Sequence, residues 1–255
     1  MTPVFTFSNL KCCYGKKTVL KNISSSIYEG TLTSLIGPNG SGKSTMLRTL
    51  AGLQKYDGVL KLNGRDLKTL PRRDFGRTGS IVPQQMNLKT PFSVYEVIAL
   101  GRLPYQSFFA PSNTDDDIIA DSAERADVAH LLCRRVTELS GGEKQRVLFA
   151  MVLAQNPDVY LLDEPTSALD PSSSIRIFSI LKELTEEGKS VIVAAHDINM
   201  SIPFSNRYIS LRGGEIIAEG EASSLDENIL NELYETSFVQ YTSDGGDTAW
   251  HPKRC

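Results

Sequence analysis

The chain has few cysteines, few histidines and no long hydrophobic run. Its 255 residues contain four cysteines, three histidines and one tryptophan. Cys12 and Cys13 are adjacent and stand far from Cys133 and Cys255, so the C-x-x-C spacing of zinc and redox sites is absent and we expect reduced thiols. The longest apolar run, Val147–Ala154, is far shorter than the roughly 18 residues of a membrane span. The first residues lack the basic segment and apolar stretch of a secretory signal. We therefore expect any work at a membrane to pass through a partner.

The chain also lacks an excess of basic charge. Its formal net charge is −3 at neutral pH, and its isoelectric point is about 5.7. Nucleic-acid binding domains usually carry clustered Lys and Arg on one face, which this composition does not suggest. The length is sufficient for a real hydrophobic core, in one domain with or without a subdomain. We predict no nucleic-acid partner.

Hydrophobic patterning predicts an α/β core. Alternation of apolar and polar residues predicts half-exposed strands of a mixed sheet at 4–7 and 18–27. Nearly continuous apolar runs are typical of buried parallel strands, and such runs occupy 159–162 and 190–194. Residues 33–36 are predicted to form a short apolar strand. Helical periodicity covers 44–53 and 171–187, the second ending at Gly188.

Residues of roughly 88–155 differ from this core because their patterns are helical. Helices are predicted at 93–100 and 115–132, and no strand pattern interrupts the stretch. We interpret it as a helical subdomain inserted into a core that extends over 1–235. The last residues, 236–255, are polar and are predicted to form a loosely held tail.

A glycine-rich loop follows the apolar strand 33–36 and precedes a helix. It matches the phosphate-binding pattern G-x-x-x-x-G-K-[ST] in the strand–loop–helix context that this pattern requires, and comprises Gly37, Pro38, Asn39, Gly40, Ser41, Gly42, Lys43, Ser44 and Thr45. Backbone N–H groups of such a loop approach phosphate oxygens at the positive end of the helix. We predict that Lys43 reaches the β- and γ-phosphates, that Ser44 binds Mg²⁺, and that Thr45 adds a hydroxyl contact. Asp163 ends an apolar strand and is predicted to hold the metal through water.

A second motif narrows the class further. Leu139-Ser-Gly-Gly-Glu143 opens a predicted helix, so Ser140, Gly141 and Gly142 form another helix N-terminus that can bind an anion. A third motif follows this helix, an apolar strand that ends in two acidic residues and a proline, Val159-Tyr-Leu-Leu-Asp-Glu-Pro165. From about Phe5 to Gly220 the chain resembles the ATPase subunit of ABC transporters, with the motifs in order and at familiar spacing. The resemblance implies a P-loop NTPase core with a mixed β-sheet, and ATP and Mg²⁺ as cofactors.

The resemblance also implies roles for individual residues. Glu164 would polarise the attacking water, and His196 would contact the γ-phosphate. Gln84, or its neighbour Gln85, would sense Mg²⁺ and the γ-phosphate. Tyr14 would stack on adenine, although a core tyrosine is the alternative. Two copies would pack head to tail, each lending Ser140, Gly141 and Gly142 to the nucleotide held by the other's Lys43, with Asp170 communicating across the interface.

The resemblance covers one ATPase cassette without membrane spans, which favours an importer with separate permease subunits. The ATPase would then lie at the cytoplasmic face of the cell membrane. A substrate-binding protein would be an indirect partner. The segment Ser93–Tyr105 is similar to that of importers of ferric siderophores, haem and cobalamin. Zinc and manganese importers have a comparable segment, and a soluble ABC ATPase of iron–sulfur cluster assembly would share every catalytic motif.

The segment 88–112 is the predicted permease contact. Its large side chains Tyr95, Arg102, Tyr105 and Phe108 resemble the anchors of an interface. Packing inside the helical subdomain is the alternative for Tyr95 and Phe108, whereas a buried Arg102 would need a partner. On the interface hypothesis, Arg102→Glu should leave the isolated ATPase nearly unchanged and abolish uptake.

Overall fold

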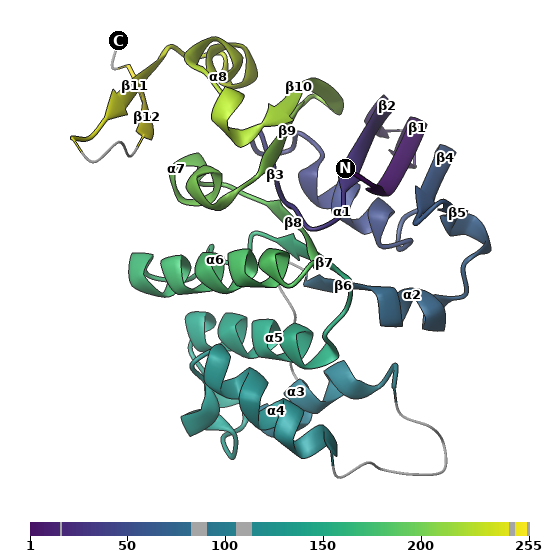
Figure 1. Cartoon of the computed structure of the whole chain (residues 1–255), viewed down its shortest axis with the longest axis vertical. Helices are drawn as coiled ribbons and strands as arrows, with labels where there is room; N and C mark the ends of the chain where they lie inside the picture. Colours follow the sequence, from purple (N-terminus) through teal and green to yellow (C-terminus); the bar gives the residue numbers. More distant parts are fainter. Residues whose placement is uncertain (16, 83–90, 106–113, 245–247, 254–255) are drawn as a thin grey trace.

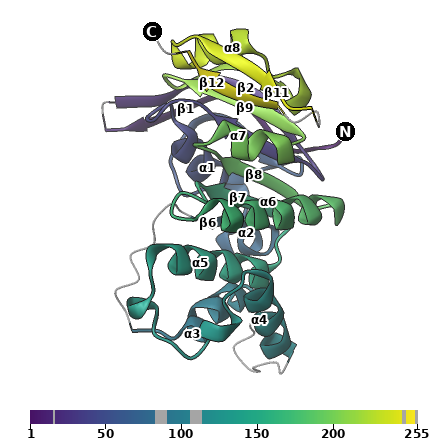
Figure 2. The same cartoon turned by 90° about the vertical axis from the view of Figure 1, so that its left-hand side faces the viewer.

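The computed structural model describes residues 1–15, 17–82, 91–105, 114–244 and 248–253. Within these ranges the strands form three sheets, and a helical segment extends away from them (Figures 1 and 2). The strands are β1 (Pro3–Tyr14), β2 (Lys17–Tyr28), β3 (Leu32–Ile36), β4 (Asp57–Leu62), β5 (Arg65–Asp66), β6 (Gly79–Val82), β7 (Val159–Asp163), β8 (Ser190–Ala194), β9 (Arg207–Arg212), β10 (Glu215–Glu221), β11 (Phe238–Thr242) and β12 (Thr248–Pro252). The helices are α1 (Lys43–Leu50), α2 (Arg72–Thr78), α3 (Val94–Ala99), α4 (Thr114–Arg125), α5 (Gly141–Gln155), α6 (Pro171–Glu186), α7 (Ile198–Ser201) and α8 (Glu227–Tyr234).

The central sheet has the order β10-β9-β3-β8-β7-β6. Strands β9, β3, β8, β7 and β6 are parallel, and β10 is antiparallel to β9, which makes the sheet mixed. Every residue of β3, β7 and β8 is buried. The prediction of buried parallel strands from continuous apolar runs is therefore confirmed for β7 and β8, because both faces of these strands are covered.

The first two strands belong to a different sheet from the one predicted. They pair antiparallel with each other, and β1 also pairs with β4, in a separate four-stranded sheet of order β2-β1-β4-β5. Alternating burial along β1 and β2 agrees with half-exposed strands. Their assignment to the mixed sheet was wrong because alternation reports burial on one face and does not identify the pairing strand.

Two hydrophobic layers enclose the central sheet. Helix α1 lies between the central sheet and the antiparallel sheet, where Met46, Leu47 and Leu50 share a buried cluster with Phe5 and Phe7 (Figure 1). Helices α5 and α6 contribute Val147 and Leu181 to a second cluster on the opposite side of β7 and β8. In the described ranges, no helix is both long and apolar enough to traverse a bilayer.

The described residues between β6 and β7 contain α3, α4 and α5 in succession, below the sheets in Figure 1. Helix α4 ends at Arg125, earlier than the predicted 132, and Asp127 then adopts a left-handed conformation with φ 58°. A left-handed residue breaks the helical hydrogen-bond ladder, so the chain turns there. Periodicity across 115–132 therefore includes a turn that sequence pattern alone did not separate.

The prediction that Arg102 is an exposed anchor is wrong. Its side chain is 12% exposed, and its Nε donates a hydrogen bond of 2.8 Å to Asp115 Oδ1. Its Nη1 donates to the carbonyl oxygen of Ala154 at 2.8 Å, and its guanidinium lies 4.5 Å from the ring centroid of Tyr105. Arg102 therefore joins the chain after α3 to the start of α4 and to the end of α5.

Replacing Arg102 with Glu should destabilise the fold. A carboxylate there would face Asp115 and the Ala154 carbonyl, and breaking such a largely buried ion pair costs about 3 kcal/mol. Thermal unfolding of the isolated chain should show a melting temperature lower by about 6–12 °C. Arg134→Glu is the matched control, since its pair with Glu138 is about half exposed and surface pairs contribute about 1 kcal/mol or less. Equal melting temperatures for Arg102→Glu and the wild type would contradict this assignment.

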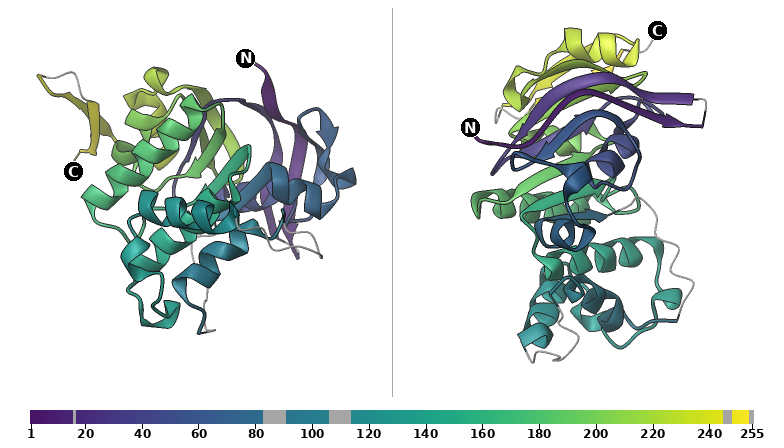
Figure 3. Two further views of the ribbon diagram at one scale, coloured as in Figure 1. Left: turned by 60° about the horizontal axis from the view of Figure 1, so that its bottom comes forward. Right: turned by 90° about the vertical axis from the view of Figure 1, so that its right-hand side faces the viewer.

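The C-terminal segment also differs from the expected loose tail. Strands β11 and β12 form an antiparallel hairpin, and Phe238 and Trp250 are buried in a cluster with Ile198 and Leu230. The hairpin stands at the end of the molecule opposite the helical segment (Figure 3, yellow). Composition suggested a tail because the segment is polar overall, whereas its two large apolar side chains are sufficient to dock it.

Candidate nucleotide-binding site

The glycine-rich loop connects β3 to α1 and approaches the neighbouring backbone closely. Gly37 has φ 145°, and a Cβ there would lie 2.0 Å from the carbonyl oxygen of Leu211. Gly42 is the N-cap of α1 with φ 114°, and neither a side-chain cap nor an acidic residue occupies the first turn. The N–H groups at this helix end therefore remain available for an anion.

Lys43 is buried within the loop. Its Nζ donates hydrogen bonds to the carbonyl oxygens of Gly37 at 2.6 Å and Pro38 at 3.2 Å. Burial lowers the pKa of the Lys43 ammonium, and the nearby carboxylates of Glu164 and Asp163 oppose that shift. The loop thus holds a buried ammonium group that is hydrogen-bonded to backbone carbonyl oxygens. A phosphate oxygen can take the place of these carbonyl oxygens.

The end of β7 brings a carboxylate to the start of α1. Ser44 Oγ donates a hydrogen bond of 2.9 Å to Asp163 Oδ1. Burial raises the pKa of Asp163, while the Ser44 hydroxyl lowers it and the Glu164 carboxylate raises it further. A bound divalent cation would favour the charged form of this carboxylate. Two oxygen donors from distant parts of the chain therefore meet at one point.

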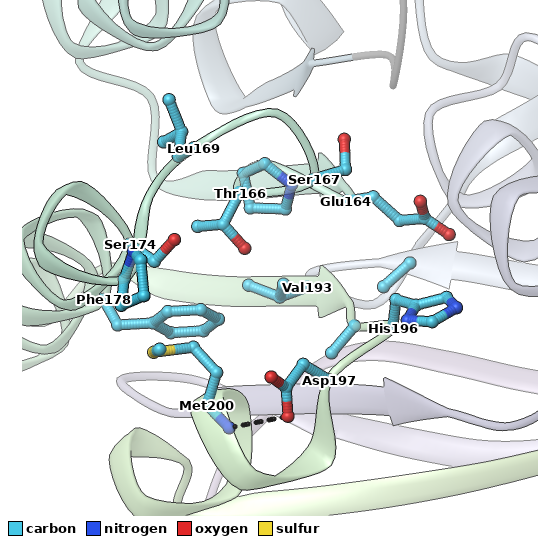
Figure 4. A pocket seen from close by; sticks show the side chains of 14 residues that line it. Glu164, Thr166, Ser167, Leu169, Ser174, Phe178, Val193, His196, Asp197 and Met200 are labelled. Atoms are coloured by element: carbon cyan, nitrogen blue, oxygen red, sulfur yellow. Dashed lines mark hydrogen bonds between the residues drawn. The ribbon is translucent and has the colours of Figure 1, made fainter. Parts of the chain in front are cut away.

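Glu164 and His196 follow two neighbouring parallel strands, β7 and β8. Glu164 has the left-handed φ of 50°, and its N–H donates to the Ala194 carbonyl at 3.0 Å. Both residues line the cavity of about 560 Å³ around the glycine-rich loop and an adjoining cavity of about 390 Å³. In the adjoining cavity their side chains point to the same side (Figure 4). A carboxylate with an unusual backbone conformation at a cleft is a typical functional feature.

The loop and its surroundings fit a nucleoside triphosphate with a divalent cation. Ser41 Oγ is buried and has no hydrogen-bond partner within the described ranges. A ligand in the cavity can supply this missing hydrogen bond. The uncapped helix end, Lys43 and Ser44 line the same cavity, and Asp163 stands behind Ser44 through their hydrogen bond. Thr45 also lines the cavity. The helix end and the Lys43 ammonium suit phosphate oxygens. The oxygen atoms of Ser44 and Asp163 suit Mg²⁺.

Two predicted contacts lie partly or wholly outside this arrangement. Tyr14 is 43% exposed at the end of β1, so it is not a core tyrosine, and it pairs in register with Lys17, which lines the cavity. Adenine stacking by Tyr14 stays a prediction. Gln84 and Gln85 lie outside the described residues, as does Phe108.

The second predicted anion site is separate from Lys43 in the same chain. Ser140, Gly141 and Gly142 are absent from the described lining of the Lys43 cavity. They begin α5, where Ser140 and Glu143 form a reciprocal capping box. The Ser140 hydroxyl and N–H hold the pKa of Glu143 below its usual range. Ser140 and Gly141 are exposed, which leaves this helix end open to another molecule.

The turn after Glu164 runs beside this helix end. A Cβ on Gly142 would lie 3.1 Å from the Ala168 carbonyl oxygen. Asp170 ends the turn as the N-cap of α6, and its carboxylate accepts hydrogen bonds from the N–H and hydroxyl of Ser173, which lower its pKa. The turn carrying Asp170 and the helix end carrying Ser140 therefore form one continuous surface.

Sequence analysis did not assign a role to Gln145. Its Nε2 donates to the Glu164 carbonyl at 2.8 Å, and its Oε1 accepts from the Ala168 N–H at 3.1 Å. Gln145 thus fixes the turn that begins at Glu164. Its position two residues after the Leu139–Glu143 motif was the available signal.

The cavity around Lys43 is also lined by residues that no sequence motif indicated. They come from strands and turns, and are Lys17, Thr18, Val19 and Gly213.

Fold and site together define a P-loop ATPase of the ABC type, and comparison with known proteins agrees. The family model described as ABC transporter matches residues 20–167. The chain belongs to this family as an ATP-binding subunit that hydrolyses ATP, so the predicted family, fold class and activity are confirmed.

Two of its relatives are ATP-binding proteins of import and transport systems. The chain is 35% identical to the iron(3+)-hydroxamate import ATP-binding protein FhuC of Bacillus subtilis over 226 residues, covering 87% of this chain and 84% of that protein. It is 37% identical to the ferric enterobactin transport ATP-binding protein FepC of Escherichia coli, covering 87% of this chain and 83% of that protein.

Solved structures give the same result. An inward-facing conformation of a metal-chelate type ABC transporter superposes with a TM-score of 0.84 at 25% identity and covers 100% of this chain and 98% of that chain. The dimeric post-hydrolysis state of the ATP-binding cassette MJ0796, bound to ADP and Pi, gives a TM-score of 0.79 at 32% identity, covering 87% of this chain and 100% of that chain.

Proposed function

We propose that the cavity around Lys43 binds Mg²⁺-ATP and that the groups at its edge hydrolyse it. Lys43 would neutralise the β- and γ-phosphates, and Ser44 and Asp163 would hold the cation, directly or through water. Glu164 would orient and deprotonate the attacking water, and His196 would contact the γ-phosphate. The observation that carries this proposal is the convergence of Glu164, His196 and the glycine-rich loop on one cavity.

A second copy would complete the site. The exposed helix end at Ser140, Gly141 and Gly142 lies on a different part of the surface from Lys43 and can serve the nucleotide of a partner. A head-to-tail dimer would place each Ser140 against the γ-phosphate held by the other chain, with the Asp170 turn at the interface. The dimeric relative bound to ADP and Pi supports this arrangement.

We propose that this ATPase energises uptake of a metal chelate, such as a ferric siderophore, haem or cobalamin, through separate permease subunits. The supporting observation is that its relatives include import ATP-binding proteins for iron(3+)-hydroxamate and for hemin. The subunit would sit peripherally at the cytoplasmic face of the membrane. A substrate-binding protein on the opposite side would deliver the cargo to the permease.

The permease would dock at an apolar groove beside the segment that sequence analysis selected. The groove has a volume of about 290 Å³ and lies between the ends of α1 and α5, helix α2 and strand β6, with Leu53, Leu70, Phe75 and Met151 in its wall. The chain after Arg102 lies against α2, since Arg77 Nε donates to the Pro104 carbonyl at 3.0 Å. Leu53 in the groove wall and Leu103 in the segment after Arg102 are both exposed and offer apolar anchors for a short permease helix.

Replacing Leu53 with Glu should separate docking from catalysis. Leu53 is 57% exposed, so the fold and the basal ATPase rate should change little, while a charge in the apolar groove should weaken permease binding by about 10-fold or more. Co-purification with the polytopic permease measures the loss. Val59→Glu is the control, because Val59 is similarly exposed on β4 and does not line this groove. Equal co-purification of both variants would place the docking surface elsewhere.

Uptake by cells tests the cargo class. A strain lacking this gene should lose accumulation of radiolabelled metal, iron or cobalt, from one chelate class. The wild-type gene should restore it, while Glu164→Gln should not. Unchanged uptake of ferric siderophores, haem and cobalamin in the deletion strain would contradict the metal-chelate proposal. Loss of zinc or manganese uptake, or of iron–sulfur enzyme activity, would identify the alternative.

A further inference from the structure

The C-terminal hairpin is hydrogen-bonded to the helix that follows His196. On α7, Asn199 Nδ2 donates to the Trp250 carbonyl at 3.0 Å, and the Trp250 N–H donates to Asn199 Oδ1 at 2.8 Å. The side-chain amide of Asn199 thus makes the pair of bonds that a neighbouring strand would make with β12. Two complementary bonds fix both the distance and the orientation of α7 relative to the hairpin.

The backbone on either side of His196 is anchored. On the N-terminal side, the Ala195 N–H donates to the Leu35 carbonyl of β3 at 3.0 Å. On the other side, the Asp197 carboxylate caps α7 by accepting from the N–H groups of Asn199 at 2.9 Å and Met200 at 3.2 Å. His196 is therefore held between β3 and a short helix, and that helix is in turn held by β12.

The same C-terminal layer reaches the start of the glycine-rich loop. Ile36, the last residue of β3, shares a buried cluster with Ile198, Phe238 and Trp250. Burial raises the pKa of Tyr234 to about 12, and the backbone of Gly37 next to its phenol opposes that shift. Helix α8 and the hairpin therefore pack together behind the loop and the His196 segment.

Short helices have little stability of their own, and α7 has only four residues. Its position must come from tertiary contacts, among which the Asn199–Trp250 pair is directional. We propose that Asn199 is a positioning residue for ATP hydrolysis, which fastens α7 to the C-terminal hairpin and thereby keeps His196 aimed at the nucleotide cavity. This inference rests on the proposed role of His196. Misplacement of a reacting group by about 1 Å can cost up to about 10²-fold in rate.

Steady-state ATPase kinetics of Asn199→Ala test the inference. We expect kcat to fall by about 3- to 30-fold with KM for ATP changed less than about 2-fold, because orientation is lost and phosphate binding is kept. In a His196→Ala background the same substitution should have no further effect on kcat, since no imidazole remains to be positioned. Asn199→Asp keeps the acceptor for the Trp250 N–H and should give an intermediate loss.

Two controls separate positioning from folding. Tyr241→Ala alters the 58% exposed ring on the same hairpin and should leave kcat unchanged. Thermal unfolding should show that both Asn199→Ala and Asn199→Asp remain folded. A wild-type kcat in Asn199→Ala, or an equal loss with and without His196, would overturn the inference while leaving the role of His196 intact. A wild-type kcat in His196→Ala would instead overturn that proposed role.

Discussion

Replacing Glu164 with Gln should lower ATP turnover by about 10²–10⁴-fold, the usual contribution of a positioned acid or base. ATP binding should remain, because Lys43 and the glycine-rich loop are unchanged. Since bound ATP would then persist, the dimer that it joins should accumulate and elute earlier on a sizing column. Gln keeps the size of the side chain and the same backbone requirement at φ 50°, so the fold should be retained.

Glu187→Gln provides the control for this experiment, because Glu187 is an exposed carboxylate at the end of α6, remote from the cavity. It should turn over ATP at the wild-type rate and show no ATP-dependent dimer beyond that of the wild type. Near-normal turnover in Glu164→Gln would remove Glu164 from the catalytic role. Lys43→Ala should behave differently from both, since losing a charge-assisted phosphate contact weakens ATP binding itself.

Replacing Ser140 with Arg should abolish hydrolysis while each chain still binds ATP. The long side chain would obstruct the helix end that we propose contacts the partner's γ-phosphate, and loss of such transition-state contacts costs about 10²–10³-fold in kcat. Nucleotide binding by the monomer should persist because Ser140 lies outside the described lining of the Lys43 cavity. Equilibrium binding of a fluorescent ATP analogue and steady-state turnover measure the two effects separately.

Mixing Ser140→Arg with Lys43→Ala chains should restore up to one working site in each mixed dimer. Coupling between sites could suppress that rescue, so a crosslink gives the firmer result. One copy would carry Ser41→Cys and the other Ser140→Cys, in a background where the exposed Cys133 is changed to Ser. A disulfide formed between chains and dependent on ATP is the expected product. If the two chains still bind ATP but form no ATP-dependent disulfide with each other, the head-to-tail dimer is refuted.

Features encoded in contiguous residues were predictable from the sequence. The glycine-rich loop is one stretch between a strand and a helix, so pattern and context predict its fold and its ligand class together. Strands β7 and β8 were predictable because burial on both faces requires a continuous apolar run. For the same reason Asp163, Glu164 and His196 could be placed at strand ends before their neighbours were known.

Contacts between distant segments needed the tertiary structure. Arg102 suggested an exposed anchor, yet its partners are Asp115 and the backbone of Ala154. Gln145 meets Glu164 and Ala168 through two hydrogen bonds that its own surroundings in sequence do not indicate. The same holds for the hairpin, where Asn199 and Trp250 are 51 residues apart.

The sequence by itself determined the ATPase family, the position of the glycine-rich loop and the identity of the charged groups around it. Local patterns carry this information because backbone conformation and ligand chemistry depend on adjacent residues. Only the tertiary structure decided which sheet holds β1 and β2, that Arg102 is enclosed, and that the polar C-terminal segment folds back behind the site. Those outcomes depend on strand pairing and on complementary partners brought together from far along the chain, which no local pattern specifies.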